Sequence, residues 1–252
     1  MKPILLLAAA LPIAALSLAA PTKSVITTIT HPVLQEEPSS VQRGVMTARQ
    51  REHSKLFKQY GAHGNLINLA QDEDVEIWRE VPLGGGVPGS APFNLRSFLQ
   101  ENVCDADAIV LASVQSKSSQ LTTDEDYVFT DYQLVVGEIL KDNLAHTIGR
   151  SEQQITLTRS GGFVSVNGHN IKAVDRVFKP LEMGKQYLLF LKFIPETLTY
   201  RSLNSRTGFL LERGQMFKLT DEGLPKELEN VSDAESFLGT IRSVVNNGCK
   251  SK

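Results

Sequence analysis

The sequence has little of several features that mark common protein classes. Two cysteines in 252 residues are too few for a cysteine-dense scaffold or a four-thiolate zinc site. Lys and Arg number 26 against 28 Asp and Glu, so no basic surplus points to nucleic acid, and we expect no such partner. The five histidines form neither an HExxH nor a His-x-His pattern. We therefore expect no metal, no cofactor and no catalytic residue.

Long apolar runs are also scarce, and the longest lies at the N-terminus. Residues 1–20 carry one charge, Lys2, ahead of an apolar run from Ile4 to Leu18, and small residues follow where a signal peptidase would cut. The run is about 15 residues, short of the roughly 20 that a spanning helix needs. We predict a secretory signal peptide, a secreted or periplasmic protein, and no membrane span after signal removal. An uncleaved anchor is the alternative.

Export changes the interpretation of the two cysteines. An even number of thiols in an oxidising compartment favours pairing, so Cys104 and Cys249 are predicted to form a disulfide. A bridge across so long a loop stabilises the fold by roughly 4–5 kcal/mol in the chain-entropy model, as an upper estimate. A catalytic thiol is the alternative, but no His or Asn pattern accompanies either cysteine.

The segment before the first cysteine divides into two parts. Residues 21–43 are rich in Thr, Pro and Ser without a sustained period and are predicted to be a linker. Residues 44–103 are predicted to be a helical region with a Gly/Pro-rich loop at 83–89. Within it, Gly44 to Tyr60 places apolar and aromatic side chains at steps of three and four, together with His53. This amphipathic helix either packs on its own domain or binds a partner.

From residue 104 to residue 220 the apolar pattern changes to a period of two, which indicates β-strands. Gly137 interrupts the longest strand and predicts a bulge, and Asn167-Gly168 predicts a hairpin turn. Residues 221–252 are predicted to form a C-terminal helix, capped at Ser232 or Asp233, and a tail. The predicted fold class is mainly β with flanking helices, built on a small closed or partly open antiparallel barrel of OB type at 104–220.

Four stretches of this region resemble a known family: CDADAIVLASV (104–114), YVFTDYQLVVGEILK (127–141), LEMGKQYLLFL (181–191) and residues 208–219. The pattern is similar to the netrin-like module of the tissue inhibitors of metalloproteinases and of complement-type proteins. The resemblance implies a five-stranded OB-type barrel and a secreted binding or inhibitory role. In those inhibitors the opening Cys is the mature N-terminus and its amine chelates zinc, whereas Cys104 follows a long preceding segment.

The functional hypotheses concern loops, because scaffolds usually place recognition there. We expect protein or peptide recognition by the connection Ser116–Asp126, with its acidic residues Asp124, Glu125 and Asp126, and by the hairpin tip with Asn167 and His169. The acidic run alternatively binds Ca²⁺ weakly. The leading function is an exported, non-enzymatic binding or inhibitor-like module. One alternative is an extracellular hydrolase using Ser160, His169 and Asp175. Another is a structural protein of the envelope.

Overall fold

The structure is a computed structural model that describes residues 46–57, 94–143, 148, 153–175, 177–220, 224–228 and 231–249, with the backbone alone at 39–40 and 75–79. All of these belong to one compact unit, Glu36–Lys252. The predicted signal peptide, nearly all of the predicted linker and the Gly/Pro-rich loop lie outside the described residues. No helix in the described part of the chain is long and apolar enough to cross a bilayer.

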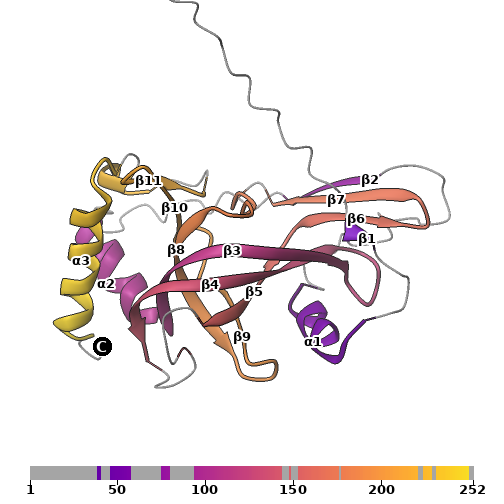
Figure 1. The fold of residues 1–252 in the computed structure, drawn as a ribbon, viewed down its shortest axis with the longest axis horizontal. Coiled ribbons are helices and arrows are strands. Elements are labelled where there is room, and N and C mark those ends of the chain that lie inside the picture. The colour runs from indigo at the N-terminus through magenta and orange to yellow at the C-terminus, as the bar shows by residue number, and fades with distance from the viewer. Residues whose placement is uncertain are drawn as a thin grey trace, which may run out of the picture. The chain divides into compact units, whose positions relative to one another are not determined.

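Five strands close into a barrel: β3 (Ala108–Leu121), β4 (Val128–Asp142), β5 (Gln154–Ser160), β8 (Gln186–Ile194) and β9 (Thr199–Ser202) (Figure 1). The ring runs β3-β4-β5-β9-β8 and closes where β8 pairs with β3. This order is the connectivity of an OB barrel, so the predicted fold class is confirmed. One pairing differs from the expected antiparallel pattern, because β5 and β9 run parallel. The intervening hairpin and β8 supply the crossover that parallel neighbours require.

Strand bulges let the sheet curl tightly enough to close. Leu111 pairs with Glu138 and Ala112 with Val136, so Gly137 is the extra residue of a bulge, as predicted. Inward-facing side chains then fill the barrel, because successive residues of a strand point to opposite faces. The interior contains Ala108, Val110, Ala112, Val114, Tyr132, Leu134, Val136, Ile155, Leu157, Tyr187, Leu189, Leu191 and Tyr200.

One end of the barrel interior is closed by a buried arginine. The guanidinium of Arg159 lies 3.7 Å from the ring centroid of Phe178 and donates to the carbonyl oxygens of Phe178 and Lys179. Burial lowers the pKa of Arg159 from its ordinary value. Burial also raises the pKa of Tyr187 to about 12, and its hydroxyl oxygen accepts from the Glu182 amide at 2.8 Å.

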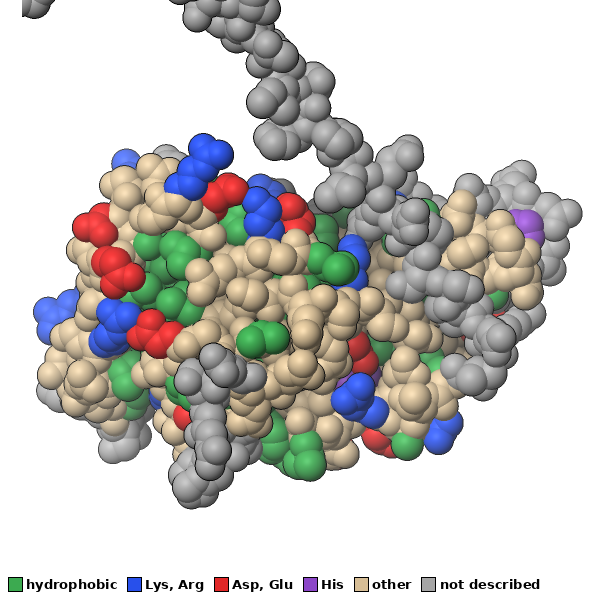
Figure 2. All heavy atoms as spheres, in the orientation of Figure 1, with side chains coloured by type: hydrophobic (Ala, Val, Ile, Leu, Met, Phe, Trp, Pro, Cys, Tyr) green, Lys and Arg blue, Asp and Glu red, His purple; other side chains and the backbone are tan. Residues whose placement is uncertain are grey.

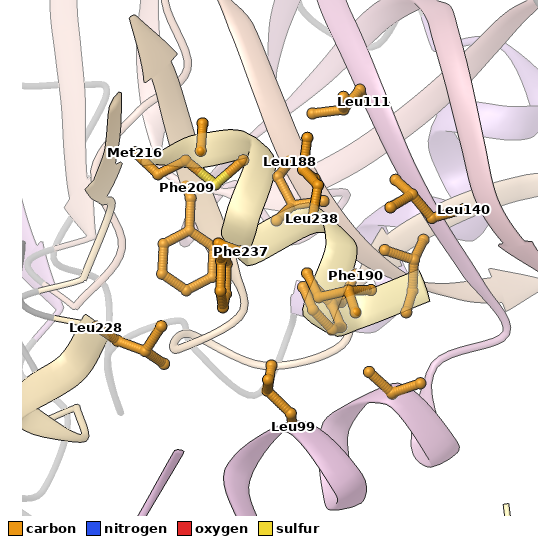
Figure 3. Close-up of a cluster of buried hydrophobic side chains, with 14 of the residues drawn as sticks. Leu99, Leu111, Leu140, Leu188, Phe190, Phe209, Met216, Leu228, Phe237 and Leu238 are labelled. Carbon is orange, nitrogen blue, oxygen red and sulfur yellow. The ribbon is translucent and has the colours of Figure 1, made fainter. Parts of the chain in front are cut away.

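A second core covers the outside of β3 and β8 at one end of the molecule (Figure 3). It is built by α2 (Leu95–Asp105), α3 (Ala234–Asn246), β10 (Gly208–Glu212), β11 (Gln215–Lys218) and the 3₁₀ turn η2 (Lys226–Leu228). Asp233 caps α3, as predicted, and Asn94 caps α2. The predicted disulfide is confirmed: Cys104 in α2 bonds to Cys249 beyond α3, with their Cα atoms 5.4 Å apart.

A smaller four-stranded sheet lies at the other end, where the β3–β4 hairpin extends past the barrel. Its order is β1 (Ser39–Ser40), β6 (Gly162–Val166), β7 (His169–Asp175) and β2 (Val75–Arg79). The β6–β7 hairpin turns at Asn167-Gly168 with φ of 53° and 88°, which confirms the hairpin prediction. Its inner face packs on the hairpin extension and on α1 (Ala48–Phe57). Residues before the barrel thus contribute to this end.

The chain passes from the barrel to this sheet through one tightly packed glycine. Gly162 has φ of 148°, and a Cβ there would lie 2.3 Å from Thr130 Oγ1 and 2.6 Å from Ser119 Oγ. We predict that Gly162→Ala lowers the free energy of unfolding by about 1–3 kcal/mol, as overpacking typically does. Urea unfolding measures the change. Gly239→Ala is the matched control, because nothing lies within 4 Å of that helical position and alanine there should stabilise.

A second prediction concerns alkaline stability. The folded pKa of Tyr187 lies above its ordinary value of 10.0, so its stabilising contribution is complete below pH 10 and is lost as the pH rises toward about 12. Wild-type protein should therefore lose stability over that window more steeply than Tyr187→Phe, whose side chain does not titrate. Urea midpoints at several alkaline pH values measure the difference. Parallel curves for the two proteins would contradict the assignment.

Candidate functional site

The predicted acidic loop is shorter than expected. Ser116–Leu121 continues β3 and pairs with β4, so only the turn between Leu121 and Val128 connects the two strands. The expectation of a recognition loop over Ser116–Asp126 is therefore wrong for its first half, because the backbone of this polar stretch pairs with β4. Asp124 is exposed, and Glu125 and Asp126 are half-buried. The β6–β7 turn, with Asn167 exposed and His169 half-buried, lies on a separate hairpin at the same end (Figure 1).

Neither a metal site nor the predicted hydrolase triad is assembled by these residues. Within the described ranges, no three His, Cys, Asp or Glu side chains gather in a way that could hold a metal ion. The Ser160 hydroxyl donates to Asp175, but His169 begins β7 and Asp175 ends it. Six strand steps at about 3.3 Å separate their Cα atoms by roughly 20 Å. His169 thus cannot serve Ser160 as a base.

The zinc-chelating mechanism of the resembling inhibitors also has no counterpart here. Cys104 is the penultimate residue of α2 and is bonded to Cys249. Phe98, Leu99 and Val103 of the same helix are buried in the core against α3 and the sheet. A new N-terminus at Cys104 would remove this helix from the core, so the amine of Cys104 is not a functional group of the folded protein.

The most organised polar cluster of the described residues lies where α1 meets the barrel. His53 of α1 is 0% exposed, and its Nδ1 lies 2.8 Å from Oδ1 and 3.1 Å from Oδ2 of Asp131 on β4. Because a carboxylate only accepts, Nδ1 carries the donated proton. The other ring nitrogen, Nε2, is hydrogen-bonded to the hydroxyls of Thr199 at 2.9 Å and Thr197 at 3.1 Å. The two hydroxyls also bond to each other at 2.7 Å.

Two further contacts hold α1 in this position. The rings of Phe57 and Phe129 stack with centroids 5.5 Å apart, and His53 meets the edge of Phe129 at 6.4 Å. Ser54 Oγ accepts from the backbone amide of Thr123 at 2.7 Å, which ties α1 to the acidic β3–β4 turn. The helix therefore bridges the β3–β4 turn and the β8–β9 turn across the outside of β4.

Local sequence explains why α1 starts where it does and which face it buries. Thr47 and Gln50 form a reciprocal capping box: the amide of Gln50 donates to Thr47 Oγ1, and the amide of Thr47 donates to Gln50 Oε1. His53 and Phe57 are four residues apart and share one face of the helix. Only His53, Ser54 and Phe57 of α1 are buried. Of the two predicted interpretations, the helix packs on its own domain.

The surface under α1 is the face that OB folds generally use for ligands. In such folds, strands two and three and the loops after strands one and four bind the ligand. Here these elements are β4, β5, the β3–β4 turn and the β8–β9 turn. Asp131, Thr158 and Thr199 point outward from their strands and yet are at most 5% exposed. An internal segment, α1, thus occupies this face, which we call the α1-covered face.

An apolar residue with an unusual backbone stands at the rim of the α1-covered face. Leu198 lies between Thr197 and Thr199 in the β8–β9 turn, is 77% exposed and has φ of 53°. The left-handed conformation costs a non-glycine residue roughly 1–2 kcal/mol, and Asn or Gly relieves it. A leucine here is therefore unfavourable both for the backbone conformation and for the hydration of its side chain.

Sequence reasoning placed His53 on the helix but did not find its partners. Asp131 is 78 residues away and Thr199 is 146 residues away, and neither belongs to a local motif. No protein-family model matches the chain, and no curated protein is found to be similar to it.

We predict that His53→Ala detaches α1 while leaving the barrel folded. A buried polar group that loses its hydrogen-bond partner typically costs about 1–3 kcal/mol, but undocking lets water solvate Asp131 and so limits the loss to the docking energy of one short helix. Hydrogen exchange should accelerate at the amides of α1 and not at those of β3 or β8. The exposed Lys55→Ala is the control and should preserve protection. If the free energy of unfolding of the whole protein instead falls by the full amount, and the amides of α1 stay protected, α1 is an integral part of the fold.

Proposed function

We propose that this is an exported, non-enzymatic binding module that recognises a protein or peptide partner. The observation that carries the proposal is the α1-covered face, because a surface framed by two turns already holds a helical segment through paired polar and aromatic contacts. Export, to the periplasm or outside the cell, is proposed from the N-terminal apolar run, and the disulfide is consistent with it. The netrin-like resemblance supports the proposal at the level of fold alone.

Binding accounts for this face better than hydrolysis does. Asp131, His53 and Thr199 are spaced like a carboxylate, a base and a hydroxyl nucleophile. A reacting carbonyl would need space about 3 Å from the hydroxyl and from oxyanion donors. Thr199 is 2% exposed, and Nε2 is shared between two hydroxyls that also bond to each other. The cluster therefore positions α1 rather than attacking a substrate.

The charge distribution suits a partner recognised by shape and a few specific contacts. Figure 2 shows Lys, Arg, Asp and Glu side chains interspersed where this side of the molecule is not drawn in grey, without a broad area of one sign. The turn that carries Asp124, Glu125 and Asp126 is acidic, whereas α1 presents Arg49, Arg51 and Lys55 on its exposed side. Mixed charge with one exposed apolar anchor is typical of transient protein interfaces.

We predict that changing either turn weakens partner binding without unfolding the protein. Leu198→Asn removes the exposed apolar side chain and suits the left-handed backbone, so its melting temperature should not fall. Asp124→Lys reverses an exposed charge on the other turn. The full mature chain is immobilised and exposed to an extract of the exporting cells. Each variant should bind the proteins that wild type captures at least tenfold more weakly, a loss of about 1.4 kcal/mol in binding free energy.

Arg213→Asn is the matched control for Leu198→Asn. Arg213 also has a left-handed φ, 52°, but lies in the β10–β11 turn beside α3, at the other end of the molecule (Figure 1). The Arg213→Asn variant should capture the same proteins as wild type. If the Leu198→Asn, Asp124→Lys and Arg213→Asn variants all capture the same proteins, the α1-covered face is not the binding site.

A further inference from the structure

We infer that α1 is an internal stand-in for the partner, and that the partner presents a helix with a basic side chain followed four residues later by an aromatic ring. This inference rests on the proposed binding function and specifies its ligand. It follows from what the α1-covered face requires of any occupant, from the spare acceptor next to Asp131, and from how weakly α1 itself is held.

The first requirement is a hydrogen-bond donor for a buried carboxylate. Asp131 is 5% exposed, and both of its oxygens face one nitrogen of His53. Burying a carboxylate without a donor is strongly unfavourable, so an occupant that covers Asp131 must bring an N–H group to it. Apolar helices are therefore rejected, and a helix with a His, Lys or Arg at this position is accepted.

The second requirement is a flat ring at a fixed distance along the helix. Phe129 lies two residues before Asp131 on β4, on the same side of the strand, and its ring stacks on Phe57 at an interplanar angle of 14°. Helical residues four apart lie one above the other on the same face. The spacing of Phe129 and Asp131 therefore selects a basic residue and an aromatic residue four positions apart, as His53 and Phe57 are.

The face also offers an acceptor that α1 leaves unused. Thr158 on β5 pairs directly with Asp131 in the sheet register and is 1% exposed. Among the residues that the structure describes, its Oγ1 is one of the buried side-chain oxygens without a hydrogen-bond partner. Buried polar atoms are usually satisfied, so this oxygen is a position where an occupant other than α1 gains a bond. A Lys or Arg in place of His53 is longer and has more donors, which suits Asp131 and Thr158 together.

α1 has few buried side chains, so it can detach from the α1-covered face. Its buried residues are one imidazole, one hydroxyl and one ring, and a ten-residue helix is marginal in water without packing. It belongs to the same chain as the face it covers, and covalent linkage typically gives a segment an effective concentration on the order of millimolar. A partner helix therefore has to compete only with α1 at that effective concentration.

The experiment uses the full mature chain and synthetic peptides of residues 46–57, capped at both ends. In one protein variant, His53→Ala together with Phe57→Ala opens the face. We expect this opened chain to bind the unchanged peptide in fluorescence anisotropy with peptide up to about 1 mM, the concentration that the tether provides. Wild-type chain should bind it at least tenfold more weakly, because its own α1 competes.

Peptide variants test the two requirements and the spare acceptor. Peptides carrying His53→Ala or Phe57→Ala should bind the opened chain at least tenfold more weakly, whereas Arg49→Ala, on the exposed side of α1, should bind within twofold of the parent. The peptide with His53→Arg should bind the opened chain at least as tightly as the parent peptide does. If it binds more tightly, Thr158→Val in the opened chain should abolish that difference between the two peptides. Near-ultraviolet circular dichroism confirms that each chain is folded.

The outcomes separate this inference from the proposed function. Equal binding of the parent peptide to wild-type and opened chains shows that α1 is not a competitor and overturns the inference. Equal binding of the parent, His53→Ala and Phe57→Ala peptides, or no binding by the opened chain at about 1 mM, also overturns it. In each case the proposed function still stands if capture depends on Leu198 and Asp124, and it fails if capture is insensitive to both.

Discussion

Closure of the barrel by β8 is the constraint on which the other features depend. One edge of β8 pairs with β3. The other edge pairs with β10 along the first half of β8 and with β9 along the second half of β8. Because β8 leads directly into β9, closure brings the β8–β9 turn close to the outer side of β4. The same strand carries Leu188 and Phe190 into the core beneath α2 and α3. A single strand thus connects the helical end to the face that α1 covers.

The two ends of the barrel are held by different kinds of interaction. The helical end is apolar and covalently reinforced, with Phe209, Phe237 and Leu238 packed near the disulfide-linked helices. At the α1 end, a carboxylate, an imidazole and hydroxyls, which are costly to bury and specific in geometry, add to the apolar packing of Phe57 on Phe129. Apolar burial suits permanent packing, whereas paired polar groups suit a contact that is made and broken. The protein therefore combines an apolar, disulfide-linked core at one end with a buried polar cluster at the other.

Much of the fold was predictable from the sequence because its determinants are local. Alternation located the barrel strands, Asn167-Gly168 the hairpin, Gly137 the bulge, and Asp233 the start of the last helix. The site was not predictable, because Asp131 and Thr199 contact His53 only after the barrel has closed. The expected loop at 116–126 failed for a related reason: polar Ser and Lys residues suggested a connection, but their backbone pairs with β4.

The Cys104–Cys249 bond encloses every barrel strand in one covalent ring, and α1 lies outside that ring. A protease that cuts one peptide bond within the barrel region leaves all of its pieces joined through sulfur. A cut between α1 and α2 instead leaves α1 held to the barrel by noncovalent contacts alone. Cleavage at these two places therefore has different consequences: after the first the pieces stay covalently joined, and after the second α1 has no covalent link to the barrel.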